Sequence, residues 1–232
     1  MQLHVGTSGY SYKEWKGSFY PEDMSTDEML RFYGEHFNAV EINNTFFRMP
    51  KPEVLEGWAA EVPKDFKFVL KASRGITHMK RLKNAGESVA YLLKMIEGMK
   101  QRIGALLFQL PPNMKKDVVR LREFLALLPK DRRAAFEFRH QSWFDEEVFA
   151  ALRERNAALC IAEAEDDLEI PFVATADFGY LRLRMPEYTD AQLKAWYERV
   201  KDQAWSDAFV FFKHEDEAKG PKLAKRFMEL EK

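Results

Sequence analysis

The sequence is poor in cysteine, in long apolar runs and in net charge, and each shortage excludes a class of protein. Cys160 is the only cysteine among the 232 residues, so neither an internal disulfide nor a cysteine-rich zinc site can form. No apolar run approaches the roughly 20 residues that cross a bilayer. The net charge is -1, so the chain as a whole lacks the basic character of a polyanion-binding protein.

Two further signals are missing. The first residues enter a strand without the basic and then apolar leader of a secreted protein. No expected strand is followed by the Gly-x-Gly-x-x-Gly or P-loop motif of nucleotide-binding folds. We therefore expect a cytoplasmic protein that does not contact a membrane. Cys160 lies in an apolar run, which favours a small buried residue without chemistry of its own.

Segments typical of strands alternate with segments typical of helices about eight times. The expected strands cover residues 2–7, 39–43, 66–72, 104–110, 134–139, 157–162, 178–184 and 208–213. Such alternation predicts a parallel sheet with helices outside. Eight units in 232 residues fit a closed (β/α)8 TIM-type barrel, which typically has roughly 250 residues. Because no linker or composition break interrupts the chain, residues 1–232 are expected to form one α/β domain. A doubly wound open sheet is the alternative, disfavoured by the missing glycine-rich motif.

The fifth expected strand carries the clearest pattern. Side chains alternate across a strand, so Phe136 and Phe138 point to one side while Glu137 and Arg139 point to the other. The phenylalanines need a covering layer of helices, which turns the charged pair toward the barrel interior near the C-terminal end of the strand. A charged pair there is costly unless it is paired or hydrated. A structural ion pair and part of an active site are both consistent with this pattern.

The same register places polar side chains at the inward, late positions of most strands, where TIM barrels carry their sites. These positions hold Ser8, Glu41, Asn43, Lys71, Gln109, Glu137, Arg139, Arg182, Arg184 and Lys213. Five are basic and two are acidic, which favours a small anionic ligand that bears a phosphate or a carboxylate. A purely structural polar network is the alternative.

Aromatic and histidine residues in the neighbouring loops extend this candidate site. Rings beside a cationic groove suit bases or sugars, so nucleic acid is a second, less favoured ligand. The alternative is that these rings only cap the end of the barrel. The loop residues added to the ligand-binding set are Tyr12, Trp15, His78, His140 and Trp143.

Several segments together resemble the YecE-like proteins, known as domain of unknown function 72. They are Val-Gly-Thr-Ser-Gly-Tyr-Ser-Tyr at 5–12 with Trp15, and residues 40–48, 71–72 with 76–78, 108–112, and 136–140 with 142–143. The resemblance implies a TIM-barrel fold, but the activity of that family is unsettled and supplies no catalytic residue. Many relatives have His-Gly where this chain has Arg184-Met185, and an Asn pair where it has Lys213-His214. These differences strengthen the basic character of the site.

Glu41 and Glu137 are the candidate catalytic residues, because metal-free glycoside hydrolysis needs two carboxylates on facing strands. Nearby Arg and Lys would lower their pKa and make a neutral general acid harder to hold. Lys71 is a candidate for Schiff-base chemistry, although a salt bridge to a glutamate is the favoured interpretation.

Metal chemistry has little support in the sequence, since His-x-His and His-Glu-x-x-His spacings are absent. We expect no metal and no cofactor. The sequence thus favours a hydrolase-type enzyme for phosphoesters or glycosides with an anionic ligand. A non-catalytic binder of an anionic metabolite or nucleic acid is the alternative, and the oligomeric state stays open.

Overall fold

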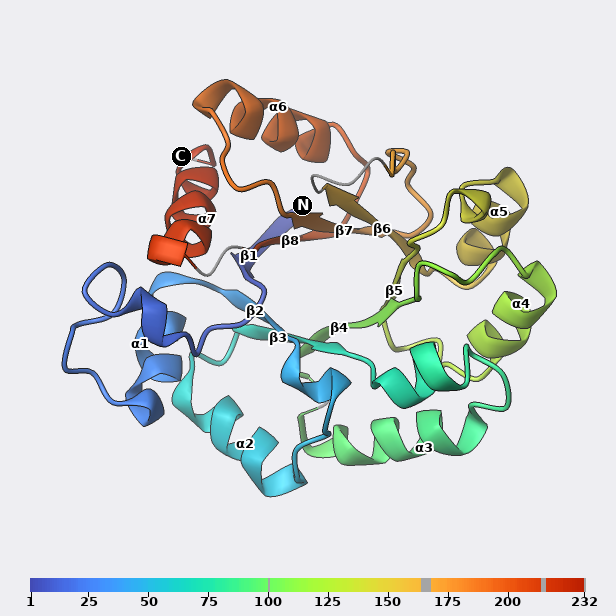
Figure 1. Cartoon of the computed structure of the whole chain (residues 1–232), viewed down its shortest axis with the longest axis horizontal. Coiled ribbons are helices and arrows are strands. Elements are labelled where there is room, and N and C mark those ends of the chain that lie inside the picture. Colours follow the sequence, from blue (N-terminus) through green and yellow to red (C-terminus); the bar gives the residue numbers. More distant parts are fainter. Residues whose placement is uncertain (100, 164–167, 214–215, 232) are drawn as a thin grey trace.

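The computed structural model describes residues 1–99, 101–163, 168–213 and 216–231. Its strands form one sheet of eight in the order β1-β8-β7-β6-β5-β4-β3-β2, with parallel neighbours. The sheet curls into a nearly closed barrel (Figure 1), which confirms the expected fold class. The strands are β1 Gln2–Thr7, β2 Ala39–Ile42, β3 Lys67–Lys71, β4 Ile103–Gln109, β5 Ala134–Glu137, β6 Ala158–Glu163, β7 Phe178–Leu183 and β8 Asp207–Phe212.

The helices surround the barrel as an outer layer (Figure 1). Two N-terminal caps predicted from the sequence are present. Ser25 and Glu28 form a capping box before the first helix. The Asp145 carboxylate accepts a hydrogen bond from the backbone N–H of Glu147. In the described parts of the chain no helix is long and apolar enough to cross a membrane. The α-helices are α1 Met29–His36, α2 Pro52–Glu61, α3 Gly86–Met95, α4 Val118–Ala126, α5 Glu146–Glu154, α6 Asp190–Lys201 and α7 Lys219–Glu229.

The two faces of the strands bury different side chains. Phe136 points outward, where its ring stacks on Phe108 at 5.2 Å and meets Phe124 of α4 at 6.1 Å. The barrel interior holds a separate set of small and aromatic side chains, among them Ala135, Cys160 and residues on β7 and β8. The predicted alternation along β5 is therefore confirmed, and Cys160 is buried as expected.

The barrel is incompletely closed between β1 and β2. Strand pairing across this seam is a single bridge, between Ser8 and Glu41, at the C-terminal ends of the strands. Next to the bridge, the backbone N–H of Gly9 donates to the carbonyl of Glu41 at 2.8 Å. The seam is thus tightest at the end of the barrel that carries the predicted site.

Side chains complete the remainder of the seam. The Tyr33 hydroxyl accepts a hydrogen bond from the backbone N–H of Thr7 at 2.8 Å and donates to the carbonyl of Ala39 at 3.1 Å. Asn38, just before β2, also links the two strands: its side-chain amide accepts from the backbone N–H of Val5 and donates to the carbonyl of Leu3 on β1. A Cβ on Gly6 would lie 1.9 Å from the Ala39 carbonyl oxygen, so only glycine fits where Tyr33 inserts.

Candidate functional site

A buried arginine links two glutamates from opposite parts of the barrel. Arg182 on β7 places one terminal nitrogen 2.8 Å from a carboxylate oxygen of Glu41 on β2, and the other donates to Glu137 on β5. All three side chains are at most 3% exposed. The strands are not neighbours in the sheet, so the side chains meet across the barrel axis. Since both terminal nitrogens are engaged, Arg182 holds the two carboxylates in place.

Glu41 is surrounded by donors. The Tyr180 hydroxyl donates to one carboxylate oxygen at 2.6 Å, and the Asn43 amide donates to the other at 3.2 Å. Burial alone would raise the pKa of Glu41, but the charge of Arg182 and the hydrogen bond from Tyr180 outweigh it. The pKa of Glu41 is therefore lowered, and this carboxylate stays ionised.

Glu137 has more cationic neighbours than Glu41. Its carboxylate accepts a hydrogen bond from the Gln109 amide at 2.8 Å and lies 3.3 Å from Arg139 Nε and 3.6 Å from a terminal nitrogen of Arg184. Burial again opposes ionisation, but the charges of Arg182, Arg184 and Arg139 lower the pKa of Glu137 to about 2. Neither glutamate is thus neutral near pH 7, and a glycosidase-type general acid would have to be neutral there.

Lys71 ends β3 beside this group and has a different environment. Its ammonium nitrogen lies 4.5 Å from the centre of the Phe46 ring. The salt bridge that we expected is not formed: no carboxylate of the described residues lies within 4 Å of this nitrogen. Both carboxylates instead pair with arginines and also accept hydrogen bonds from neutral side chains. Burial, followed by the charge of Arg182, lowers the pKa of Lys71 from 10.5 to about 8.

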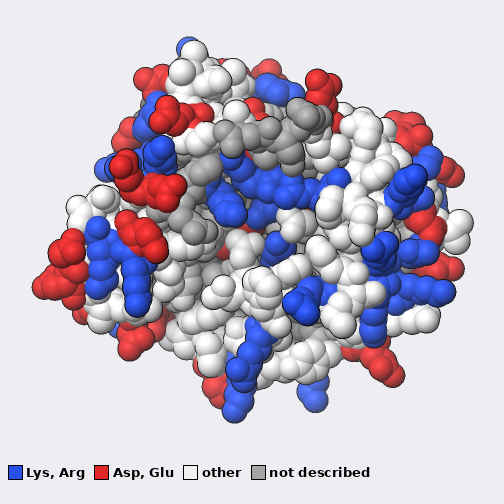
Figure 2. Space-filling view, viewed as in Figure 1, with Lys and Arg blue, Asp and Glu red and all other residues white. Residues whose placement is uncertain are grey.

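The end of the barrel where the strands terminate is positively charged. Figure 2 shows Lys and Arg gathered over the middle of this face, with Asp and Glu mostly at its periphery. Within the described residues, the inner group consists of four cationic side chains and two carboxylates. The side chains of Arg139 and Arg184 are 23% and 12% exposed, against 3% for Arg182. The two outer arginines, Arg139 and Arg184, are therefore more exposed than Arg182.

The comparisons with known proteins show the family and the fold. A family model described as protein of unknown function DUF72 matches residues 4–232. The chain belongs to the DUF72 family. A DUF72 crystal structure from Thermotoga maritima superimposes over the whole of both chains with a TM-score of 0.84 and 26% identity. One from Enterococcus faecalis covers 99% of this chain and 97% of its own, with a TM-score of 0.78 and 18% identity, which supports the fold alone.

Two curated proteins, both named UPF0759, are similar to this chain over part of its length. The UPF0759 protein YecE of Escherichia coli K12 is 34% identical over 143 residues, which are 61% of this chain and 50% of YecE. The UPF0759 protein YunF of Bacillus subtilis is 28% identical over 153 residues, or 61% of this chain and 52% of YunF. The chain thus spans about half the length of the curated relatives that it matches.

Two tryptophans that we expected in the ligand site of this DUF72 chain are core residues. Trp143 is fully buried, stacks on Phe138 at 4.6 Å and donates its indole N–H to the carbonyl of Met114. Trp15 is buried among aromatic rings of the first loop, and its ring is tilted against that of Tyr12 with the ring centres 4.8 Å apart. Both rings belong to the hydrophobic core that lies between the strands and the surrounding helices and loops.

The other loop residues of the predicted site have mixed positions. Tyr12 donates its hydroxyl to the Ser8 carbonyl at 2.8 Å and, with Asn43, lines a small cavity of about 90 Å³. His140 accepts a hydrogen bond from the backbone N–H of Ser142, which makes it a turn cap. Ser8 is buried beside Glu41, while Lys213 is exposed just after β8.

Three features of the DUF72 site were missed by the sequence analysis. Tyr180 lies on the inward face of β7, as the alternation indicated, but was not included in the site. Phe46 contacts both Lys71 and His78, whose ring centre lies 4.9 Å away. A π-helix covers Gly75–Met79, and no simple sequence signal announces it.

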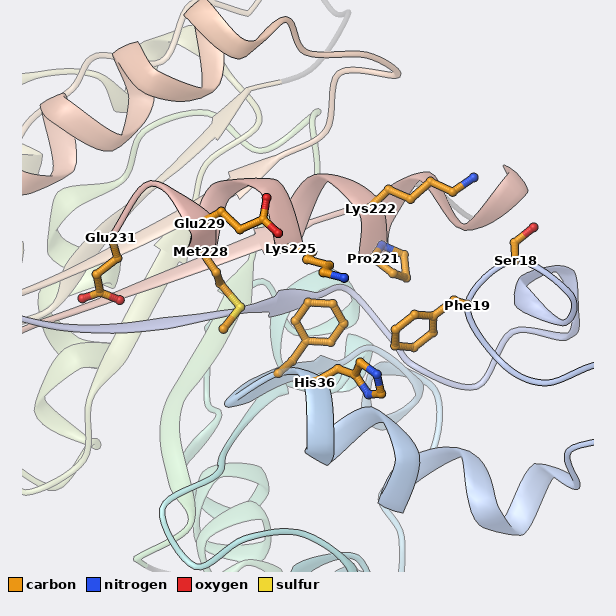
Figure 3. Close-up of a pocket in the computed structure, with 10 residues that line it drawn as sticks. Ser18, Phe19, His36, Pro221, Lys222, Lys225, Met228, Glu229 and Glu231 are labelled. Atoms are coloured by element: carbon orange, nitrogen blue, oxygen red, sulfur yellow. The ribbon is translucent and has the colours of Figure 1, made fainter.

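Metal ligands and cavities add two observations. Among the described residues, no three His, Cys, Asp or Glu side chains come together in a way that could hold a metal ion. His214 lies outside the described residues, so the prediction of no metal stays a prediction. A groove of about 570 Å³ lies outside the barrel between α1 and α7 (Figure 3). It is lined by Phe19, Phe37, Met228 and charged residues of α7, and by none of the predicted site residues.

Proposed function

We propose that this DUF72 protein binds a small anionic ligand, bearing a phosphate or carboxylate group, at the C-terminal end of its barrel. The observation that carries the proposal is the pairing pattern. Arg182 holds both buried glutamates, while Arg139 and Arg184 lie beside them with part of each side chain exposed. Arginine's planar fork suits bidentate capture of a phosphate or carboxylate.

The charge pattern favours this proposal over hydrolysis by a pair of glutamates. Such a mechanism needs one neutral carboxylic acid, and both Glu41 and Glu137 have lowered pKa values. A further role follows for Arg182, which we first placed among the ligand contacts. Because Arg182 is buried and doubly engaged, it organises both glutamates, and Glu137 in turn orients the outer arginines.

Ligand-induced stabilisation tests the proposal. We expect phosphate and citrate to raise the melting temperature of the wild type above that in sodium chloride of equal ionic strength. Arg184→Gln and Arg139→Gln should each weaken binding by about 1.5–3 kcal/mol, the range for a charge-assisted hydrogen bond, which is at least about tenfold in Kd. Arg122→Gln is the matched control, since Arg122 pairs with Glu154 on the outer helices.

The same measurement has outcomes that contradict the proposal. If phosphate and citrate stabilise the wild type no more than sodium chloride does, the basic group is structural. Equal stabilisation of the wild type and both site variants would place the anion elsewhere.

Nucleic acid is the second candidate ligand. Phe47 is 73% exposed and packs edge-on against Phe46, which contacts Lys71, so one ring is available for stacking near the cations. The burial of Trp15 and Trp143 removes two other expected rings, and the smaller ligand is therefore preferred. A single-stranded oligonucleotide that bound much more tightly than a nucleoside monophosphate would reverse this preference.

A further inference from the structure

We propose that Lys71 is a nucleophile that forms a Schiff base with a small carbonyl-bearing anion, such as a 2-oxo acid or a phosphorylated aldehyde. The inference rests on the proposed anion site: Arg139 and Arg184 would hold the anionic group while the carbonyl carbon faces Lys71. It gives the site a substrate class and a reaction, neither of which follows from anion binding alone.

The placement of Lys71 is the first argument. It ends β3 at the end of the barrel where TIM-barrel enzymes carry their chemistry, and it is partly buried. Its amine faces the Phe46 ring, and no carboxylate of the described chain lies within 4 Å. A lysine that serves only the fold would be expected to pair with one of the two nearby glutamates. Here Arg182 occupies both carboxylates, which leaves the Lys71 amine for another role.

The electrostatic surroundings of Lys71 favour the neutral amine that a nucleophile requires. Burial has the largest effect, and the charges of Arg182 and Arg139 act in the same direction, while those of Glu41 and Glu137 oppose it. The contact with Phe46 also favours the ammonium form, as cation–π contacts do. Burial and the surrounding charges lower the pKa of Lys71 to about 8, so a substantial fraction of the amine is neutral at physiological pH.

The loop after β3 supplies a second, independent argument. It contains the π-helix Gly75–Met79 and three non-glycine residues in the left-handed region, with φ of 48° at Arg81, 68° at Leu82 and 51° at Asn84. Such irregular backbone costs free energy and clusters at functional sites. The π-helix places the His78 ring against Phe46, the same ring that Lys71 contacts.

His78 is suited to carry the protons of this reaction. Burial and the charge of Lys71 lower the pKa of His78, so its ring is neutral at pH 7 and can accept a proton. The Lys71 nitrogen forms a bond to the carbonyl carbon, and the carbonyl oxygen becomes a hydroxyl with a proton that leaves the nitrogen. The hydroxyl then departs as water with the second proton of the nitrogen, carried by His78, and the carbon–nitrogen double bond forms. No oxidant or reductant is needed, because amine and carbonyl give one imine and one water.

Reductive trapping tests the inference. The folded protein is incubated with pyruvate or glyceraldehyde 3-phosphate and reduced with sodium borohydride, and the labelled peptide is identified by mass spectrometry. We expect one adduct per chain at Lys71, formed at least about tenfold faster at pH 7.5 than at any other lysine, because the neutral fraction follows the lowered pKa. Labelling at Lys71 should rise between pH 7 and 9 with a midpoint near 8.

Matched variants and probes separate the possible failures. Lys71→Met should lose the adduct, whereas Lys67→Met, at the other end of β3, should keep it. Because the site of labelling is mapped in the wild type, the result does not depend on the folding of either variant. Acetone, which has a carbonyl and no charge, should label Lys71 more slowly than pyruvate does.

Each outcome bears on one of the two proposals. If phosphate and citrate stabilise the protein but Lys71 is not labelled, or is labelled no faster than Lys67, the nucleophile is wrong and the anion site stands. If Lys71 is labelled as fast by acetone as by pyruvate and no anion stabilises the protein, the lysine is reactive but the anion site is wrong.

Discussion

Replacing Arg182 by methionine should convert the ion triad at the barrel centre into two buried carboxylates without their shared counter-charge. Removing one partner of a buried ion pair typically costs about 3–5 kcal/mol, because an uncompensated charge remains. Glu137 would keep Arg139 and Arg184, whereas Glu41 would keep only the hydrogen bonds of Tyr180 and Asn43 and more distant charges. We therefore expect Arg182→Met to lose about 3–5 kcal/mol at pH 7, mainly through Glu41.

The pH dependence of stability should also change sign. In the wild type the pKa of Glu137 is lowered from 4.5 to about 2, which corresponds to about 3 kcal/mol of stability. That stability is fully present above pH 4.5 and is lost as the pH falls toward 2. In Arg182→Met, burial should dominate at Glu41 and raise its pKa above 4.5. The raised pKa stabilises the variant at low pH, so its stability should increase as the pH falls from 7 toward 4.5.

Urea denaturation at a series of pH values measures both effects. The double variant Arg182→Met with Glu41→Gln removes the unpaired charge, and should recover part of the lost stability and flatten the pH dependence. Arg122→Met breaks an exposed pair with Glu154 and should cost at most about 1 kcal/mol. The reasoning is refuted if Arg182→Met loses less than about 1 kcal/mol at pH 7, or if its stability falls on acidification as that of the wild type does.

Two predictions concern the fold. Tyr33→Phe should cost about 1–3 kcal/mol in urea denaturation, because the buried N–H of Thr7 and the carbonyl of Ala39 lose a shared partner, whereas Tyr91→Phe on the surface should change little. An unchanged midpoint in Tyr33→Phe would mean that the seam closes without the hydroxyl. Phe136→Ala should leave a cavity that costs about 3–5 kcal/mol, and a loss below about 1 kcal/mol would show that the surrounding rings collapse to fill it.

Alternation along single strands gave the most reliable predictions from the sequence. The contrast between Phe136 and Glu137 determines which side of β5 faces the helices, since a slip of one residue would bury the charge against them. The same rule placed Glu41 and Arg182 inside the barrel. Their meeting across the axis then follows, because a barrel of eight strands is just wide enough for side chains to fill.

Features that depend on how side chains fit together in space could not be predicted from the sequence. An aromatic residue in a loop has the same local pattern whether it plugs the core, as Trp15 does, or stays exposed, as Phe47 does. The absence of a salt bridge at Lys71 depends on which cation lies nearest each carboxylate. Arg182 donates to both Glu41 and Glu137, and no strand pattern predicts this. The Tyr33 hydroxyl at the seam likewise depends on the gap between β1 and β2, which no strand pattern encodes.

The two glutamates explain how so many cations can share one end of a barrel. Four basic side chains without carboxylates would repel one another and would have to lie apart or lose protons. Two carboxylates bring them together, so the group holds four cationic side chains against two carboxylates. The charges of Arg182 and Arg139 add to burial in lowering the pKa of Lys71, and under the proposed function the cationic group attracts an anion to Arg139 and Arg184. A bound anion would offset part of the positive charge of this group, so anion binding should raise the pKa of Lys71 and slow its reaction with a carbonyl that is not part of the anion. Phosphate should therefore slow labelling of Lys71 by acetone through the raised pKa, and should slow labelling by pyruvate further because it occupies Arg139 and Arg184, so the preference of Lys71 for pyruvate over acetone is expected to fall as phosphate is added.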